Sequence, residues 1–359
     1  MGQRCSANVI GAGMTREMPE AGIVAGPPPS AVMMQLLGGF QVSQAIYVVA
    51  VLGVATILEQ EGPQTVADLA ERTGAKREPL HRLIRTLAPL GVFTTDGEYV
   101  NVTPVGTTLS EKHPQSLHGI ARMWMETHYL PFSELLHSVR TGHPGSDKYL
   151  GEPFFDWIAN DLRREVLFSQ AMADVTSSLR TGMFDDYQLP AGRTVADIGG
   201  SDGSVLVELL THDGDAGRRG ILFDRPTTVP AAGPVLSAAG LTDRIEVLAG
   251  DFFIEVPPAD IYVLSAILHD WDDNACQLLL GSIAAAASPG ARLLLIEGVV
   301  PEGDEPHLTK AIDLTMLGML TGKERTEKEY RDLLDSAGFT LDRIVPTPSP
   351  LSVLEATLR

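Results

Sequence analysis

The ten residues from Ser265 to Asn274, with the sequence SAILHDWDDN, include the side chains of this chain best suited to chemistry near neutral pH. An apolar segment over 261–267 has the composition of a β-strand, and His269 and Asp270 follow where it ends. Open α/β sheets bind their ligands outside the carboxyl ends of their strands. A histidine beside a carboxylate is also well suited to act as a general base. We therefore predict an active site around His269.

The same run has the form of a helix start. Asp272 or Asp273 can cap a helix over 275–287, because a carboxylate at this position accepts a hydrogen bond from a free backbone amide. This structural explanation of the acidic residues is compatible with chemistry at the neighbouring histidine. The case for chemistry depends on the residues upstream and downstream.

Three further carboxylates, Asp197, Asp224 and Asp251, follow one another at equal intervals. Each comes at or near the end of a predicted strand, and the strands alternate with helical segments. The predicted strands cover 194–198, 221–223, 245–248, 261–264 and 293–296. Alternating strands and helices are typical of right-handed βαβ units and a parallel, doubly wound sheet. The three carboxylates are therefore predicted to lie along one edge of that sheet.

The first of these carboxylates precedes a glycine-rich loop, Gly199-Gly200-Ser201-Asp202-Gly203. Glycines at this place let the backbone approach a ligand closely. The spacing G-x-G-x-x-G of a dinucleotide site is absent, and Asp197 would repel a phosphate. A cationic or zwitterionic ligand is favoured instead.

The next two carboxylates suit the parts of an adenosine. Asp224 can accept hydrogen bonds from both ribose hydroxyls, Asp251 can accept one from the adenine amino group, and Phe252 offers a ring to the base. An adenosine with a cationic attachment describes S-adenosylmethionine. Cys5 and Cys276 suggest neither a disulfide nor a metal site, and we expect no metal and a reducing, cytoplasmic setting.

The residues over 31–110 are predicted to form a mainly α-helical, winged-helix-like domain. Thr65 caps a short helix that Gly74 ends, a second helix covers 76–90, and a hairpin with an Asp-Gly turn covers 92–100. Basic and acidic residues are equally numerous over 65–100, and the whole chain has a net charge of −19. Both facts disfavour nucleic acid as a partner and favour a role in protein contacts.

The segment from Ala21 to Leu58 contains no charged residue. Its best candidate for a membrane span, Val42–Leu58, is short and contains polar residues and Gly53. We predict no membrane segment here, but apolar helices that form a homodimer interface. Residues 1–30, rich in glycine and proline, are predicted to be a disordered tail without a signal peptide.

Four motifs then resemble one family in the same order along the chain. They are Asp197–Gly203, Gly250–Phe253, Leu268–Trp271 and Gly322–Thr326. The chain resembles the small-molecule O-methyltransferases, which include the plant caffeic-acid type and actinobacterial enzymes of natural-product biosynthesis. The resemblance covers about 31–357. It implies a dimerisation domain over 31–110, connecting helices over 111–190 that contribute to the acceptor pocket, and a Rossmann-like methyltransferase domain over 191–359.

The resemblance also implies roles for individual residues. His269 would be the base, with Glu297 and Glu324 beside it. The expected cofactor contacts are Asp197, Gly199, Gly203, Asp224, Asp251, Phe252, Ser265 and Trp271. The expected acceptor contacts are Phe168, Met172, Asp270 and Met316.

Several of these residues have ordinary structural explanations as well. Phe168 and Met172 share a helix face and could equally be core. Glu297 could simply end a strand, and Glu324 could pair with Arg325.

Two positions depart from the family pattern. Ser201 stands where a third glycine is usual, and Ser265 stands where lysine or arginine is more common. Either change could alter cofactor affinity.

We therefore expect transfer of a methyl group from S-adenosylmethionine to a hydroxyl of a small aromatic compound. Two alternatives remain. One is a relative that binds the same cofactor for decarboxylation or hydroxylation, and the other is a ligand-sensing regulator built on the winged helix. The complete set of His269, Glu297 and Glu324 argues against the first, and the charge balance argues against the second.

Overall fold

The computed structural model describes residues 27–359. The tail predicted over 1–30, including Cys5, lies almost entirely outside the described residues, and a helix begins at Pro29. The chain divides into two units, the first ending at Val42 and the second covering Ser43–Arg359.

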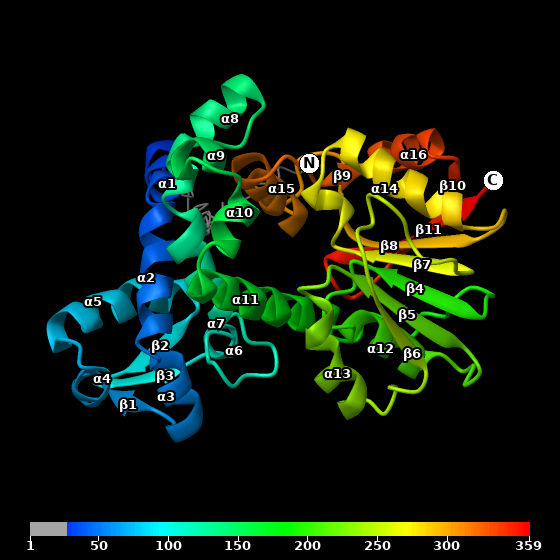
Figure 1. The fold of residues 1–359 in the computed structure, drawn as a ribbon. Helices are drawn as coiled ribbons and strands as arrows, with labels where there is room; N and C mark the ends of the chain where they lie inside the picture. The colour runs from blue at the N-terminus through cyan, green and yellow to red at the C-terminus, as the bar shows by residue number, and fades with distance from the viewer. Residues whose placement is uncertain (1–26) are drawn as a thin grey trace, which may run out of the picture. The chain divides into compact units, whose positions relative to one another are not determined.

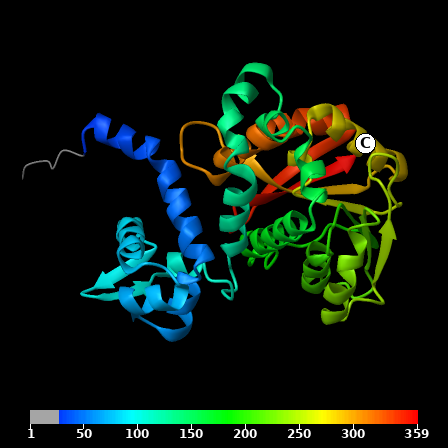
Figure 2. The same cartoon turned by 60° about the vertical axis from the view of Figure 1, so that its left-hand side comes forward.

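The apolar helices near the N-terminus are α1 (Pro29–Leu37), α2 (Gly39–Val51) and α3 (Val54–Glu61). Among residues 27–359 no single helix is long and apolar enough to cross a membrane; α1 and α2 pass that test only as a pair bent by 44° (Figure 2). The span considered over Val42–Leu58 is not one helix, because Gly53 adopts a left-handed conformation with φ +67° and separates α2 from α3.

A small winged-helix-like unit follows. Its elements are β1 (Gln64–Thr65), α4 (Val66–Thr73), α5 (Arg77–Leu87), β2 (Phe93–Asp96) and β3 (Tyr99–Val102). Thr65 caps α4 by accepting a hydrogen bond from the Asp68 amide, and Gly74 ends it with φ +69°. The predicted second helix stops at Leu87 and continues only as a 3-10 turn over Ala88–Leu90. The short β1, which the sequence pattern did not indicate, pairs with β3 beside the hairpin.

Helices connect this unit to the large sheet. They are α6 (Pro104–Thr107), α7 (His118–Met123), the π turn η2 (Trp124–His128), η3 (Pro131–Glu134), α8 (Leu135–Thr141), α9 (Gly145–Leu150), α10 (Phe154–Ala159) and α11 (Leu162–Arg180). Phe154 and Ile158 of α10 are buried with Met319, and three aromatic side chains, Phe132, Trp157 and Phe168, pack against that small core.

The C-terminal half is the predicted Rossmann-like domain. Its strands are β4 (Thr194–Ile198), β5 (Arg219–Asp224), β6 (Ile245–Ala249), β7 (Ile261–Ser265), β8 (Arg292–Val300), β9 (Arg325–Thr326), β10 (Phe339–Pro346) and β11 (Leu351–Leu358). The order in the sheet is β10-β11-β8-β7-β4-β5-β6, and β9 pairs with β8. The five strands predicted from the sequence pair in parallel, as expected. Two further C-terminal strands, which the sequence pattern did not indicate, add an antiparallel edge, because β11 runs antiparallel to both β8 and β10.

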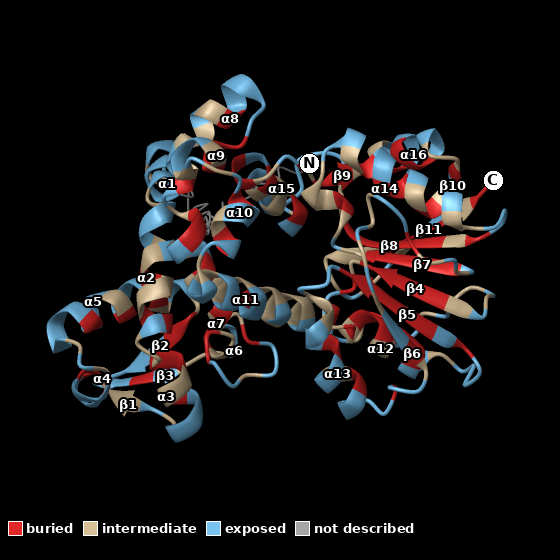
Figure 3. Ribbon diagram, in the orientation of Figure 1, coloured by how far each residue is buried: buried red, intermediate tan, exposed pale blue. Residues whose placement is uncertain are grey.

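Helices cover both faces of this sheet, as Figure 1 shows: α12 (Ser204–His212) and α13 (Ala232–Ala238) on one, α14 (Asp273–Ala286) and α16 (Glu327–Ser336) on the other. Successive side chains of each strand point to opposite faces. Val195 and Val263 therefore join the core beneath α12 and α13, while Ala196 and Tyr262 join the core beneath α14 and α16. The central strands are buried on both sides (Figure 3), as expected for parallel strands.

Candidate active site

His269 lies on a short turn directly after β7. The strand ends at Ser265, within the apolar run over 261–267 and one residue beyond the predicted strand over 261–264. Ala266 has φ +52°, and a 3-10 turn covers Leu268–Asp270. A positive φ at a residue other than glycine is unusual and is often found at functional sites. This sharp turn carries the imidazole from the end of the strand to the edge of the sheet.

Glu324 binds the imidazole directly. Its Oε1 lies 2.7 Å from His269 Nδ1, and its side chain is only 2% exposed, against 19% for the imidazole. The Glu324 amide donates to Asp313 Oδ1 of α15 (Leu308–Met319) at 3.0 Å. The carboxylate thus fixes the ring and selects the tautomer with the proton on Nδ1, so that Nε2 is left as the basic nitrogen.

Gly298 of β8 leaves room for that carboxylate. A Cβ at this position would lie 2.8 Å from Glu324 Oε2 and 2.5 Å from Thr309 Cγ2. Real Cβ atoms do not approach other atoms so closely, and thus the glycine is required for the observed position of Glu324.

Glu297, the other predicted partner of the base, has a different position. Its Oε1 accepts the amides of Ile267 at 3.0 Å and Leu268 at 2.8 Å, and its Oε2 has no hydrogen-bond partner among the described residues. No hydrogen bond joins it to the imidazole within that part of the chain. Glu297 therefore holds the backbone turn that carries His269, and its carboxylate acts on the ring only through its charge.

Asp270 lies on the other side of the ring. Its Oδ1 is 3.5 Å from His269 Nε2, which is too long for a strong hydrogen bond. The family resemblance implied a contact of this residue with the acceptor. In the structure it faces the nitrogen that would take a proton.

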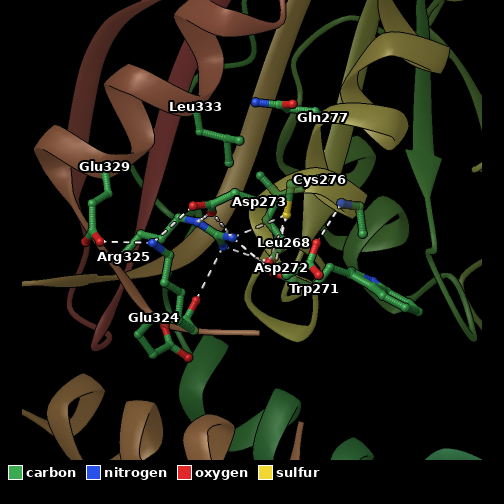
Figure 4. A network of polar contacts seen from close by, with 12 residues as sticks. Leu268, Trp271, Asp272, Asp273, Cys276, Gln277, Glu324, Arg325, Glu329 and Leu333 are labelled. Carbon is green, nitrogen blue, oxygen red and sulfur yellow. Dashed lines mark hydrogen bonds and ion pairs between the residues drawn. The ribbon is translucent and has the colours of Figure 1, made fainter. Parts of the chain in front are cut away.

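Arg325 has a positioning role that the sequence did not predict. Its guanidinium is fully buried and donates to the Leu268 carbonyl at 2.8 Å and the Trp271 carbonyl at 3.0 Å. It also binds Asp273 Oδ1 at 2.8 Å, as Figure 4 shows. The considered pairing of Glu324 with Arg325 is not found, because the two neighbouring side chains bind different partners.

The turn after β7 is held at two further points. Asp272 caps α14 by accepting the Ala275 amide at 2.9 Å, as one of the two predicted caps. Gly322 packs so tightly against the turn that a Cβ would lie 1.9 Å from the His269 carbonyl oxygen. The backbone around His269 is thus fixed from both sides.

The charges around the ring favour its protonated form. Burial of the imidazole lowers the pKa of His269, but the surrounding carboxylates outweigh burial and raise that pKa to about 10. For carboxyl groups burial has the opposite effect: it raises the pKa of Glu297 to about 7 and also raises the pKa of Asp270. An imidazole among three carboxylates is well suited to hold a proton once it has received one.

The glycine-rich loop lies at the carboxyl end of β4, at the same edge. Gly199 has φ +73°, and a Cβ there would lie 2.6 Å from Ile267 Cδ1. Gly203 has φ +80° and precedes α12. Ser201, the departure from the family pattern, also has a positive φ, +53°, which explains why glycine is usual at this position.

Asp224 stabilises that unusual conformation. Its Oδ2 accepts the Ser201 amide at 2.8 Å, and its Oδ1 accepts the Arg225 amide at 2.6 Å. A carboxylate has about four acceptor positions, so capacity for ligand hydroxyls remains.

Asp197 carries the clearest indication of a cationic ligand. Both of its oxygens are buried without a hydrogen-bond partner among residues 27–359. Burial raises its pKa to about 7, although the charge of Arg180 opposes the rise. A buried carboxylate without a partner is costly, and a cation beside it would offset that cost. The site thus fits the positively charged amino and sulfonium groups of S-adenosylmethionine.

An aromatic group completes this edge. Phe252 packs edge-on against Phe253 with centroids 4.7 Å apart and against Trp271 at 6.3 Å. Asp251 is exposed and accepts the Phe253 amide at 2.9 Å. Ser265, at the end of β7, is half-buried.

The other three predicted acceptor residues lie on two helices. Phe168 and Met172 of α11 are half-buried, and Phe168 packs edge-on against Phe154 and Phe155. Met316 of α15 is buried. Two surface hollows lie instead at the amino ends of the strands, beside Arg193 and Thr194, where α/β sheets do not bind ligands. Residues 27–359 contain no cluster of metal ligands.

Known proteins resemble the chain over most of its length. The O-methyltransferase domain family matches residues 132–340, and the O-methyltransferase dimerisation domain family matches residues 34–112. The chain is 38% identical to a phenazine O-methyltransferase of Lysobacter antibioticus over 92% of this chain and 96% of that protein. It is 32% identical to aclacinomycin 10-hydroxylase of Streptomyces purpurascens over 91% of this chain and 90% of that protein.

A solved structure is also similar. It is an O-methyltransferase of neocarzinostatin biosynthesis in complex with S-adenosylmethionine and 2-hydroxy-5-methyl naphthoic acid. The two chains are 33% identical, with a TM-score of 0.74, and the match covers 88% of this chain and 96% of the other.

Proposed function

Because this chain belongs to the S-adenosylmethionine-dependent O-methyltransferase family, we propose that His269 removes the proton of a phenolic hydroxyl while that oxygen takes the methyl group. The observation that carries the proposal is the 2.7 Å contact between His269 Nδ1 and Glu324 Oε1. It leaves Nε2 free to act as the base. When bound, the cofactor supplies the methyl group and a sulfonium charge that makes its sulfur a good leaving group.

The residues at the sheet edge would bind that cofactor. We assign Asp224 to the ribose hydroxyls, Asp251 and Phe252 to the adenine, and Asp197 to the cationic end. Arg180, whose Nη1 is buried without a partner among the described residues, lies within electrostatic reach of Asp197 and would bind the carboxylate of the same ligand. The sides of the same cofactor site would be formed by Gly199, Gly203, Ser265 and Trp271.

The base must be neutral before it can act, and the free protein opposes this because its carboxylates raise the pKa of His269 to about 10. A positive charge nearby disfavours the imidazolium. We expect binding of the cationic cofactor to lower the pKa of His269. The base would then be neutral only when the methyl donor is in place.

After proton transfer, the same groups would stabilise the imidazolium. Glu324 accepts Nδ1–H, Asp270 faces Nε2, and Glu297 keeps the turn in position. A base of this type contributes about 10²–10⁴-fold to the rate. Proximity and alignment of the oxygen with the methyl group contribute about 7–11 kcal/mol more.

The acceptor would be a flat, hydroxylated aromatic compound. The half-buried Phe168 and Met172, the buried Met316 and the aromatic side chains of α10 favour an apolar, planar ligand. Relatives that act on a phenazine or bind a naphthoic acid are consistent with this class.

The second candidate function is hydroxylation, favoured by the relative named as a hydroxylase. Hydroxylation of a ring carbon does not require a base aimed at a hydroxyl proton, so the His269–Glu324 pair favours methylation. Residues 34–112 match a dimerisation domain, and we propose that they mediate homodimer formation and do not serve a DNA-binding regulator.

A panel of phenols, flavonoids, phenazines and anthracyclines, incubated with methyl-labelled cofactor, tests the proposal. We expect label in an O-methyl group of at least one hydroxylated aromatic compound, and loss of transfer when that hydroxyl is blocked. Label-free products that carry a new hydroxyl would support the second candidate instead.

A further inference from the structure

The π turn η2 places two buried polar residues beside the aromatic core of the connecting helices. In this turn the Tyr129 amide donates to the Trp124 carbonyl at 2.9 Å, five residues back. π turns are rare and are frequently found at functional sites. Thr127 and His128, at its end, are only 2% and 8% exposed.

The contacts of Thr127 determine where the imidazole of His128 carries its proton. The Thr127 hydroxyl donates to the Met123 carbonyl at 2.7 Å, and the same oxygen lies 2.7 Å from His128 Nδ1. A hydroxyl has one proton, so both short contacts are satisfied only if Nδ1–H donates to the Thr127 oxygen. Burial also lowers the pKa of His128 to about 4, which keeps the ring neutral. The ring therefore has a proton on Nδ1 and a free lone pair on Nε2.

The His128 ring lies beside the aromatic side chains of α10 and α11 that we assign to the acceptor site. It packs edge-on against Phe154 with centroids 5.1 Å apart, and Phe154 packs against Phe168 at 6.1 Å. Phe154 also shares a core with Met319 of α15, the helix whose Asp313 holds Glu324. In the described part of the chain, no group donates a hydrogen bond to Nε2.

We propose that His128 selects acceptors by accepting, at Nε2, a hydrogen bond from a second donor group on the aromatic ligand. That group would be a hydroxyl or amino group other than the hydroxyl that is methylated. An ether or carbonyl oxygen at the same place would put two lone pairs against each other. A carboxylate would meet a neutral ring that offers no compensating charge. The inference rests on the proposed function, because it concerns the acceptor of that reaction.

Matched pairs of acceptors test this selection. Once an acceptor has been found, it is compared with analogues in which the second donor is replaced by hydrogen or by methoxy. We expect wild-type protein to prefer the donor-bearing compound by about tenfold in kcat/KM, the worth of a well-formed hydrogen bond. The His128→Phe variant keeps the edge contact with Phe154 and should lose that preference, while it still methylates the donor-free analogue. His128→Gln, which retains an acceptor oxygen, should restore part of it.

Two controls separate selection from general damage. His143→Phe, at an exposed position, should keep the wild-type preference. Calorimetry with S-adenosylhomocysteine should give the same affinity for the His128 variants as for wild type, which shows that they are folded. An unchanged preference in a folded His128→Phe variant would overturn the proposal.

The predicted tautomer can be measured without any acceptor. In ¹⁵N NMR spectra of the imidazoles, Nε2 of His128 should be unprotonated in wild-type protein. The Thr127→Val variant lacks the hydroxyl oxygen that accepts the proton of His128 Nδ1. The ring can then carry its proton on Nε2, and this variant should favour the methoxy analogue. Protonation of Nε2 in wild-type protein would contradict the proposal even if no acceptor is ever methylated, and a failure of methylation alone would count only against the proposed function.

Discussion

At the scale of single residues, the base and its partners occupy unequal roles. Glu324 touches the ring of His269, Glu297 holds the backbone beneath it, and Asp270 faces its free nitrogen. Their combined charge stabilises the imidazolium, which is the form of the ring after proton transfer. Before the reaction, the positive charge of the cofactor would lower the pKa of His269 and so favour the neutral ring.

The pKa of His269 should depend on the charge of the bound cofactor. Titration of His269 by NMR should give a pKa well above the ordinary value of about 6.5 in the free protein. Binding of S-adenosylmethionine should lower this pKa more than binding of S-adenosylhomocysteine, because only the first carries a sulfonium. Equal pKa values in the two complexes would show that the sulfonium does not act on the ring. Because the neutral ring is the base, turnover at saturating cofactor should rise with pH through the pKa of the complex.

Asp224 is predicted to have two functions at once, binding the ribose and stabilising Ser201 in a left-handed conformation. Asp224→Ala should weaken binding of both S-adenosylmethionine and S-adenosylhomocysteine by at least about tenfold, since it removes hydrogen bonds to a charged acceptor. Ser201→Gly, which relieves the backbone, is the matched control and should bind at least as tightly as wild type. Calorimetry showing unchanged affinity in folded Asp224→Ala would remove this residue from the site.

At the scale of elements, the turn after β7 depends on glycines that give space to other groups. Gly298→Ala would bring a methyl group to 2.8 Å from Glu324 Oε2. Displacement of this carboxylate should lower turnover by about 10-fold or more, because a base that is no longer oriented loses efficiency. Gly281→Ala, an exposed helix position with open space around it, is the control and should add up to about 1 kcal/mol of stability without loss of turnover. A fully active Gly298→Ala variant would show that the Glu324 carboxylate does not require the space left by Gly298.

The elements also show what sequence can and cannot predict. β4 was predicted over Thr194–Ile198 because a buried parallel strand is a short, continuous apolar run. β7 ends two residues before the apolar run over 261–267 does, because Glu297, distant in sequence, accepts the amides of Ile267 and Leu268. The antiparallel β10 and β11 were missed, since a run of strands gives no sign of the direction in which it joins a sheet. Only tertiary contacts could reveal the role of Arg325, because its partners Leu268, Trp271 and Asp273 lie 57, 54 and 52 residues away in the sequence.

At the scale of the whole molecule, the exposed apolar side chains of the N-terminal helices favour association with another protein surface. α1 buries none of its residues, and Met34, Leu36 and Leu37 are each more than 60% exposed. An apolar surface of this kind drives association, in agreement with the match to a dimerisation domain.

We therefore predict a particle of about twice the 38.5 kDa of one chain in light scattering at micromolar concentration. Leu36→Glu combined with Leu37→Glu should shift the protein toward the monomer. Lys76→Glu, a charge change at an exposed position outside α1, should leave the dimer intact. A mass near 38.5 kDa for wild-type protein would contradict the homodimer.

The central claim is that His269 is the general base, and the most direct test is the pH–rate profile of His269→Ala with a phenolic acceptor at saturating cofactor. Turnover should fall by about 10²–10⁴-fold near neutral pH. It should recover as pH rises and the phenol ionises unaided, while binding of S-adenosylhomocysteine stays nearly unchanged. Glu324→Gln, which loosens the ring but leaves the base, should be less severe. Wild-type turnover in His269→Ala between about pH 6 and 9 would contradict the assignment.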